Sequence, residues 1–522
     1  MTDPAPVALT VDAVVRARAA ADPNKPMVID PAQRLSYGDL DASTRELAAV
    51  FVQGGVGKGT RVGLLMPNGV DWVRIAIALT RIGAVLVPLS TLLPPPELAA
   101  QLRVAGVSVL ISVEEFRGRR YLDDLRTPSA ELPALQQVWS TGWVARATAA
   151  SAARRIVDAM TATVTPADLL LIVFTSGSSG PPKGVVHSHG SALGAVESGL
   201  AARCITANTR LYLPMPFFWV GGLGGGVLSA LMAGATLVTE ERPTPESTCR
   251  LLEAERVTLF RGWPDQAAAL ASHAGDTDLS ALQPGSLDAL LPPQLRAEPG
   301  ARANLFGMTE SFGPYCGYAA DTDLPRSAWG SCGKPFAGMD VRIVDSATGA
   351  PVAAETIGMI QLRGPHTLRG LCGRSREQTF TADGYYPTGD LGRLDQDGFL
   401  YYHGRSDDMF KVSGATVYPS EVEKALRSIT GVRDAVVVNL ADRAGNRVAA
   451  VIAGAGLSVE MLRDRARDVL SPFKVPTVWL VVPGTDAIPR GPTGKVDKRR
   501  IQDMLTTRDR AVAGAEQRRE RI

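Results

Sequence analysis

The 522-residue chain contains little cysteine, and its five cysteines are scattered without any C-x-x-C pair. Disulfide frameworks and cysteine-rich zinc sites need paired or closely spaced thiols, so this pattern argues against both and favours a reducing, cytoplasmic setting. No apolar run approaches the ~18 residues that cross a bilayer. The first residues lack the basic and then apolar pattern of a signal peptide. Together these absences predict a protein without a transmembrane segment.

Charge of one sign is also lacking, because 55 Lys and Arg residues nearly balance 53 Asp and Glu residues and leave a net charge of +2. Such a chain has no basic field for nucleic acid, so we expect no nucleic-acid partner. Its length exceeds that of one ordinary domain, and 45% hydrophobic residues are ample for a core. Composition therefore predicts a globular protein of more than one domain.

The most informative segment is residues 169–190. An apolar run at 169–174 predicts a buried strand, and a second apolar run begins at Val185. Between them lies TSGSSGPPKG, which has small side chains, several hydroxyl groups and one lysine. The backbone N–H groups of such a loop can form a concave nest around an anion. We therefore predict a polyphosphate-binding loop made of Thr175, Ser176, Gly177, Ser178, Ser179, Gly180 and Lys183.

A flexible Gly/Ser connector is the alternative interpretation of this loop. The loop also differs from the common phosphate-loop pattern G-x-x-x-x-G-K-[ST], because Lys183 follows two prolines and precedes a glycine. Its short length, its lysine and its place between two strand-like runs favour phosphate binding.

Two other patterns suggest sites but have simpler explanations. His187 and His189 could share a strand face as a metal pair, yet no third ligand is evident and zinc needs three or four. The glycine-rich residues 221–226 contain no G-x-G-x-x-G in any frame, so we expect tight helix packing rather than dinucleotide binding.

Hydrophobic periodicity predicts an α/β fold. Residues 61–111 read as strand, helix, strand, helix, strand, which implies parallel strands with right-handed crossovers, and residues 210–260 repeat this pattern. After about residue 335, short strands with Gly/Pro turns predict a β-rich part. From about residue 405 a smaller α+β unit follows, with a helix at 419–427 and two strands joined by a Gly445-Asn446 turn.

The chain resembles the AMP-forming adenylate enzymes, the superfamily of acyl-CoA synthetases, nonribosomal adenylation domains and firefly-type luciferases. Five ordered motifs carry the resemblance: residues 61–90, the loop at 175–184, NLFGMTE at 304–310, the stretch 386–423 that begins YPTGDLG, and PRGPTGKVDKRR at 489–500. The family's fold implies a large N-terminal domain of two packed α/β halves plus a small β-barrel, followed by a small mobile α+β domain. We expect domains at 1–404 and 405–522.

The resemblance implies an adenine and magnesium site in the NLFGMTE motif. Phe306 and Gly307 would contact adenine, Thr309 would bond a phosphate, and Glu310 would bind Mg²⁺ and support catalysis. The chemistry agrees, because Mg²⁺ takes oxygen ligands and bridges phosphate oxygens. Without the resemblance, Phe306 would read as a core aromatic.

The resemblance gives four residues of the last two motifs a role. Asp390 would accept hydrogen bonds from two ribose hydroxyls, and Arg405 would contact ribose or phosphate. Lys495 would reach the substrate carboxylate and the α-phosphate as a catalytic cation. Asp407 would be the hinge between the domains. The alternatives are a turn residue for Asp390 and a solvated lysine for Lys495.

The resemblance places the acyl pocket around residues 216–221, where we predict Phe218, Trp219 and Gly221 as lining residues together with Trp263. This segment carries no charge, which argues against an amino-acid substrate. The chain departs from the family in two places: Trp219 stands where many acyl and aryl ligases have a histidine, and the segment before NLFGMTE is shortened. Phe260, Leu290 and Leu291 either line the rebuilt pocket or belong to the core.

The sequence therefore predicts an AMP-forming carboxylic acid–CoA ligase that uses ATP, Mg²⁺ and CoA. A medium- or long-chain fatty acid is favoured as substrate, and an aromatic or alicyclic acid comes next. The alternatives are an acyl-AMP ligase that serves a carrier protein, a luciferase-like oxygenase, and a nucleotide-binding module without catalysis. No carrier module follows the small domain, so we expect a stand-alone enzyme, and a homodimer is a further expectation.

Overall fold

The structure is a computed structural model, and it describes residues 9–124, 132–175, 182–406, 408–412, 415–442, 445–491 and 494–519. The chain divides into two compact units. Unit 1 comprises Met1–Val341, Leu362–Tyr386 and Gly398–Leu400, and unit 2 comprises Arg342–Gln361, Pro387–Asp397 and Tyr401–Ile522. The predicted boundary at residue 404 stays a prediction.

A seven-stranded sheet in unit 1 has the order β17-β8-β7-β4-β3-β5-β6. Its strands are β3 (Arg61–Leu65), β4 (Val85–Pro88), β5 (Val109–Ser112), β6 (Gln137–Ser140), β7 (Leu169–Thr175), β8 (Lys183–Ser188) and β17 (Gly370–Leu371). The five strands from β7 to β6 are parallel, which confirms the parallel pattern predicted for residues 61–111. Strands β8 and β17 continue the sheet in antiparallel pairing.

A five-stranded sheet in the same unit has the order β11-β9-β10-β1-β2. Its strands are β1 (Pro26–Ile29), β2 (Arg34–Ser36), β9 (Arg210–Tyr212), β10 (Thr236–Val238) and β11 (Leu259–Phe260). All of its pairings are parallel except that of β1 with β2. Parallel sheets need helical crossovers, and the helical patterns between these strands supply them.

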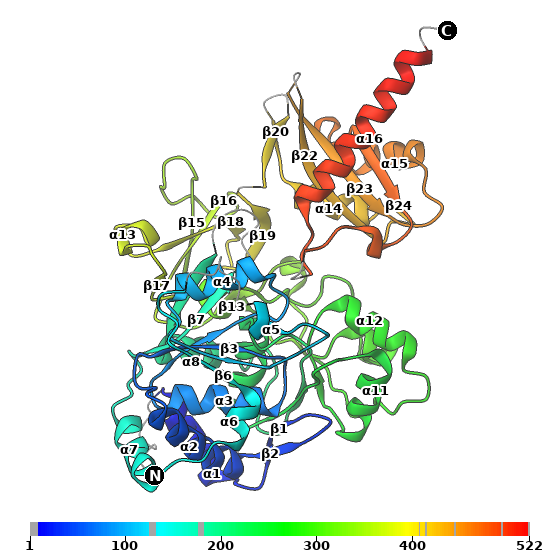
Figure 1. The fold of residues 1–522 in the computed structure, drawn as a ribbon. Helices are drawn as coiled ribbons and strands as arrows, with labels where there is room; N and C mark the ends of the chain where they lie inside the picture. The colour runs from blue at the N-terminus through cyan, green and yellow to red at the C-terminus, as the bar shows by residue number, and fades with distance from the viewer. Residues whose placement is uncertain are drawn as a thin grey trace. The chain divides into compact units, whose positions relative to one another are not determined.

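The longer helices of unit 1 are α1 (Val11–Ala21), α2 (Tyr37–Gln53), α3 (Val70–Arg81), α4 (Pro95–Ala105), α7 (Ser151–Ala162), α8 (His189–Ser198), α11 (Pro245–Ala254) and α12 (Pro264–His273). The shorter ones are α5 (Tyr121–Asp124), α6 (Thr141–Arg146), α9 (Val220–Gly222), α10 (Ser229–Ala233) and α13 (Arg376–Thr379). Helices α1, α2 and α3 pack together, as do α11 and α12 (Figure 1). None of the described helices is long and apolar enough to cross a membrane.

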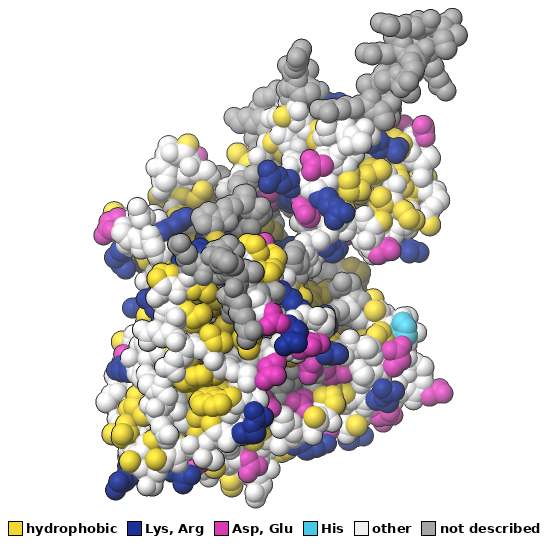
Figure 2. Space-filling view, in the orientation of Figure 1, with side chains coloured by type: hydrophobic (Ala, Val, Ile, Leu, Met, Phe, Trp, Pro, Cys, Tyr) yellow, Lys and Arg dark blue, Asp and Glu magenta, His cyan; other side chains and the backbone are white. Residues whose placement is uncertain are grey.

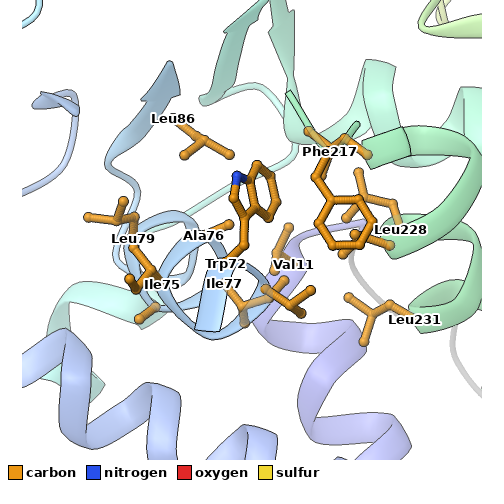
Figure 3. Packing of buried hydrophobic residues seen from close by; sticks show 14 of the residues in the cluster. Val11, Trp72, Ile75, Ala76, Ile77, Leu79, Leu86, Phe217, Leu228 and Leu231 are labelled. Atoms are coloured by element: carbon orange, nitrogen blue, oxygen red, sulfur yellow. The ribbon is translucent and has the colours of Figure 1, made fainter. Parts of the chain in front are cut away.

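The core of unit 1 lies between the two α/β halves. Trp72 of α3 is fully buried, and its ring meets the ring of Phe217 edge to face at 5.3 Å (Figure 3). Around this pair lie apolar side chains of both halves, among them Leu86 of β4 and Leu228. Burial of each large apolar side chain stabilises the folded state by about 1.5–3 kcal/mol. The two halves therefore share one core, as the predicted packing requires.

A four-stranded sheet of order β15-β16-β18-β19 occupies the region where the sequence predicts a small β-barrel. Its strands are β15 (Asp340–Val344), β16 (Gly358–Arg363), β18 (Tyr386–Leu394) and β19 (Leu400–Arg405). A three-stranded sheet of order β12-β13-β14 consists of β12 (Phe306–Met308), β13 (Gly313–Gly317) and β14 (Lys334–Pro335), and the NLFGMTE motif runs through β12 into the turn that follows it.

The remainder of unit 2 is the predicted α+β part. It contains β20 (Phe410–Val412), β21 (Ala415–Val417), α14 (Pro419–Arg427), β22 (Asp434–Asp442), β23 (Gly445–Ala453), α15 (Val459–Val469), β24 (Val478–Val482) and α16 (Lys498–Arg519). The predicted Gly445-Asn446 turn is wrong, because both residues pair in the ladder, Gly445 with Asp442 and Asn446 with Ala441. The ladder of β22 with β23 includes Gly445 and Asn446 as its last two pairs, so cross-strand pairing overrides their turn preference.

Charged side chains of both signs are interspersed over the face in Figure 2, in keeping with a net charge of +2.

Candidate active site

The predicted phosphate loop connects two antiparallel strands. Thr175 ends β7 and pairs with Lys183, which begins β8, so the loop is the tip of a hairpin. Lys183 is exposed at this tip. The predicted ligands Ser176, Gly177, Ser178, Ser179 and Gly180 lie outside the described residues. The structure therefore shows the two bases of the loop, Thr175 and Lys183, next to each other.

His187 connects the hairpin to the NLFGMTE motif. Its ring is fully buried, and Nε2 lies 2.8 Å from the carbonyl oxygen of Thr309. Burial lowers the pKa of His187 from 6.5 to about 4, so the ring is neutral at pH 7. A carbonyl oxygen only accepts hydrogen bonds, so His187 Nε2 carries the ring proton and is the hydrogen-bond donor. Nδ1 lies 3.3 Å from Ser191 Oγ, in the Ser188–Ser191 capping box that starts α8.

The turn that presents Thr309 and Glu310 depends on two backbone features. A Cβ on Gly307 would lie 2.0 Å from the carbonyl oxygen of Gly313, so only glycine fits there. After the 3₁₀ turn Thr309–Ser311, Phe312 has a left-handed φ of 52°, which reverses the chain into β13. The ring of Phe306 meets Tyr315 edge to face at 5.6 Å. Phe306 is half-buried, and its adenine contact stays a prediction.

Glu310 is buried, and one hydrogen bond holds its side chain while another holds its backbone. Tyr386 Oη donates a 2.9 Å hydrogen bond to Glu310 Oε1. The backbone N–H of Leu368 donates to the Glu310 carbonyl oxygen at 2.7 Å. Leu368, which lies just before β17, and Tyr386, which begins β18, are both far from Glu310 in sequence. The fold thus brings residues 310, 368 and 386 together, with Tyr386 at the carboxylate and Leu368 at the backbone.

This carboxylate fits Mg²⁺ bound together with a nucleotide. Within the described part of the chain, no three His, Cys, Asp or Glu side chains form a metal-binding group. Mg²⁺ usually takes only one or two protein carboxylates and completes its shell with phosphate oxygens and water. A single buried carboxylate beside a phosphate-loop hairpin matches that donor set, whereas an all-protein cage does not.

Asp390 and Arg405 form a second cluster, inside unit 2. Arg405 Nη1 donates to the carbonyl oxygen of Thr388 at 2.9 Å and lies 3.3 Å from Asp390 Oδ1. Gly389 lies between them with φ +74°, and a Cβ there would meet Arg405 Nη2 at 2.8 Å. The absence of a side chain at Gly389 therefore lets the guanidinium lie across the strand. The predicted ribose pair is adjacent in the structure, and its ligand role stays a prediction.

Lys495 lies in a tight turn of unit 2. Arg490 and Val496 form an antiparallel bridge, and Gly491 N–H donates to the Lys495 carbonyl oxygen at 2.8 Å. Gly494 has φ +77°, and the Lys495 side chain is exposed. The predicted hinge residue Asp407 lies outside the described residues. The catalytic role of Lys495 stays a prediction.

The predicted acyl segment is held in place by Asn68, which sequence reasoning missed. Asn68 Oδ1 accepts from Phe217 N–H at 2.8 Å, and its Nδ2 donates to the Met215 carbonyl oxygen at 3.0 Å. This side chain fixes the stretch just before Phe218 and Trp219. The only sequence signal was an asparagine between a strand and a helix.

Three aromatic rings follow one another in this region. Trp219 meets Phe218 at 5.5 Å and Trp263 at 6.1 Å, both edge to face. Trp219 and Trp263 are partly exposed, and their role as pocket-lining residues stays a prediction. By contrast Phe260, Leu290 and Leu291 are buried in one cluster with Tyr212, which favours the core interpretation of these three residues.

The glycine run 221–226 forms α9 and a π-helical stretch, Leu223–Leu228. A Cβ on Gly222 would lie 2.1 Å from the Pro216 carbonyl oxygen, and one on Gly224 would lie 3.1 Å from the Phe312 ring. The expected tight helix packing is thus present. It brings the acyl segment and the turn after Glu310 into contact.

Comparisons with known proteins agree with this architecture. The model of the AMP-binding enzyme family matches residues 15–372. The 3-[(3aS,4S,7aS)-7a-methyl-1,5-dioxo-octahydro-1H-inden-4-yl]propanoyl:CoA ligase of Mycobacterium tuberculosis is 31% identical over 504 residues, covering 92% of this chain and 96% of that protein. The long-chain-fatty-acid–CoA ligase FadD13 of the same species is 28% identical, covering 94% and 98%.

Solved structures show the same fold. The anthranilate CoA ligase AuaEII in complex with anthranoyl-AMP has a TM-score of 0.79 at 22% identity, over 96% of this chain and 98% of that one. The O-succinylbenzoate CoA synthetase of Bacillus subtilis with ATP and magnesium has a TM-score of 0.76 at 22% identity, over 94% and 99%. These likenesses confirm the predicted fold class, and the matches together confirm the predicted resemblance: the chain belongs to the family of AMP-binding enzymes.

Proposed function

We propose that the protein is an AMP-forming carboxylic acid–CoA ligase. In the first half-reaction a carboxylate oxygen attacks the α-phosphorus of ATP, which gives an acyl-adenylate and releases pyrophosphate. In the second, the thiol of CoA attacks the acyl carbon, AMP leaves, and a thioester forms. Mg²⁺ would supply charge neutralisation on the phosphates, held by Glu310.

The observation that carries this proposal is the His187–Thr309 hydrogen bond of 2.8 Å. It joins strand β8, which begins at Lys183, to the turn that bears the buried Glu310 carboxylate, and this supports a triphosphate site made of the predicted phosphate loop, its lysine and that carboxylate. Such a site binds and polarises a triphosphate, and a positioned cation and hydrogen-bond donors stabilise charge that develops there. The curated relatives are acid–CoA ligases, which supports the same reaction class.

For the acid, the uncharged aromatic segment favours an apolar molecule. The relatives' names cover a long-chain fatty acid, a 3-hydroxybenzoate and a propanoate on an alicyclic dione. We propose a fatty acid first and an aromatic or alicyclic acid next. The walls at Trp219 and Trp263 would be in contact with the part of the acid farther from the carboxylate.

The test separates adenylation from thioester formation. Protein, ATP and Mg²⁺ are mixed with a panel of fatty, aromatic and alicyclic acids, and hydroxylamine traps any acyl-adenylate as a hydroxamate. Adding CoA should then yield acyl-CoA and AMP. Hydroxamate without acyl-CoA would favour the carrier-protein ligase, and ATP binding without pyrophosphate release for any acid would favour a non-catalytic module.

A further inference from the structure

Tyr386 is a tyrosine whose hydroxyl group points at the carboxylate that the proposed function assigns to Mg²⁺. It begins β18, and its Oη donates to Glu310 Oε1 at 2.9 Å. Its ring lies edge-on to Phe380 at 6.3 Å and packs on the apolar cluster of Val185, Leu368 and Leu371. The ring is therefore anchored, and the hydroxyl has a defined position.

The backbone of the same turn is fixed by other groups. Leu368 N–H donates to the Glu310 carbonyl oxygen at 2.7 Å, and His187 donates to the Thr309 carbonyl oxygen at 2.8 Å. Once the backbone is fixed, the remaining freedom of Glu310 is in its own side-chain torsions. The Tyr386 hydrogen bond to Oε1 removes that freedom. Among the described residues none donates to Oε2, so that oxygen stays available as a ligand.

We propose that Tyr386 is a positioning residue for Glu310, holding one carboxylate oxygen so that the other is presented to the magnesium–nucleotide complex. This inference rests on the proposed function, which gives Glu310 its metal role. A hydrogen bond from a neutral hydroxyl to a carboxylate is stronger than one between two neutral groups. Without the hydrogen bond from Tyr386, the Glu310 carboxylate samples several rotamers and binds metal less well.

The chain offers a matched control in the preceding residue. Tyr385 also has a hydroxyl that donates to a carboxylate, but that carboxylate is Asp340, and Arg363 covers the Tyr385 ring at 4.4 Å. Tyr386→Phe and Tyr385→Phe each remove one hydroxyl and nothing else. Only the first is bonded to Glu310.

The experiment measures metal binding as well as activity. Mn²⁺ replaces Mg²⁺ as the probe, and its binding to the protein with a non-hydrolysable ATP analogue is followed by electron paramagnetic resonance. Mg²⁺ is then titrated in the hydroxamate assay. For Tyr386→Phe we expect the Mn²⁺ dissociation constant and the half-saturating Mg²⁺ concentration to rise about tenfold, the loss expected for one hydrogen bond to a charged group. Tyr385→Phe should keep wild-type values.

The proposal is overturned if Tyr386→Phe binds Mn²⁺ like the wild type, or if Tyr385→Phe weakens binding equally. Thermal unfolding of both variants shows whether either loss is a folding defect. The variant Glu310→Gln separates a failure of the Tyr386 role from a failure of the proposed ligase function. If it keeps wild-type metal binding while the wild type still forms hydroxamate, the Tyr386 role is wrong and the ligase function stands. If the wild type forms no hydroxamate with any acid, the ligase function is wrong, and the Mn²⁺ comparison still decides the role of Tyr386.

Discussion

Glu310 shows how one functional side chain depends on residues from distant parts of the chain. Its neighbours Leu368 and Tyr386 and the histidine at 187 come from three segments separated by many residues. The sequence motif predicted Glu310 itself, because a carboxylate beside a phosphate loop suggests Mg²⁺. It could not predict which side chains orient the carboxylate, because that requires knowing that β8, β17 and β18 come together.

At the same scale, Trp219 tests the acyl pocket. If Trp219 lines the acyl pocket, Trp219→Ala should make room beside Trp263 and shift preference toward bulkier acids, in a graded way, because apolar pockets discriminate by roughly 1–3 kcal/mol per methylene. The measurement is kcat/KM across a series of acids. Trp143→Ala, at a tryptophan that is 42% exposed on α6, is the matched control. An unchanged profile for Trp219→Ala would show that this side chain does not line the pocket.

His189 gives a prediction for pH. The histidine is buried, and desolvation lowers its pKa from 6.5 to about 4; the Asp168 charge raises the pKa and the Lys58 charge lowers it, both by less than desolvation does. Between pH 6.5 and 4 the unfolded chain therefore binds a proton that the folded protein does not, so stability falls as the pH is lowered through this range. The contribution is up to about 3 kcal/mol.

The check on His189 is urea unfolding at several pH values for the wild type and His189→Asn. The asparagine side chain can still accept from Val11 N–H, which His189 Nδ1 does at 3.3 Å, but it does not titrate. We expect a lower stability than wild type at pH 7 and a shallower loss toward pH 4. An identical pH dependence would contradict the assignment.

At the level of elements, the strand pair β12–β13 explains why the NLFGMTE motif has a glycine at position 307. Gly307 comes so near β13 that a Cβ would overlap the Gly313 carbonyl oxygen at 2.0 Å. The sequence identified Gly307 as a nucleotide contact by resemblance. The structure adds a packing reason, since no larger residue permits the register that places Thr309 and Glu310 after β12.

Gly307→Ala should therefore lower the free energy of unfolding by about 1–3 kcal/mol, the usual cost of overpacking. Gly370→Ala is the control, because a Cβ at Gly370 meets no atom within 4 Å and its φ is not left-handed. Thermal and urea unfolding of the two variants provide the comparison. Equal stability of both variants would mean that β12 and β13 separate easily.

At the level of the whole molecule, Lys495 and the Asp390–Arg405 pair belong to unit 2, whereas Lys183, Thr309 and Glu310 belong to unit 1. Adenylation needs a lysine at the α-phosphate, yet a thiol must later approach the same carbonyl. The family resemblance answers this with rotation of the small domain about a hinge at Asp407, and a few backbone dihedrals can absorb such a motion.

Two variants separate the half-reactions. Lys495→Ala should block acyl-adenylate formation and largely spare thioester formation from supplied acyl-adenylate, and Arg499→Ala, an exposed cation nearby, should spare both. Asp407→Pro fixes φ and should impair thioester formation more than adenylation, with Asp407→Ala as its control. Single-turnover assays of each half-reaction decide the matter. Equal slowing of both halves by Lys495→Ala would contradict the alternation model.

The sequence by itself determined the α/β class, the order of most strands and helices, and the identity of the motifs, because hydrophobic periodicity and turn residues are local properties. It misplaced the Gly445-Asn446 turn, since both residues belong to the last pairs of the β22–β23 ladder, a partnership that local turn preference does not reveal. Only the tertiary structure decided that Asn68 fixes the acyl segment, that His187 joins the hairpin to Thr309, and that Tyr386 holds Glu310. These contacts link residues far apart in the chain, and pairing of that kind is decided by packing and hydrogen bonding in the folded state, not by any local pattern.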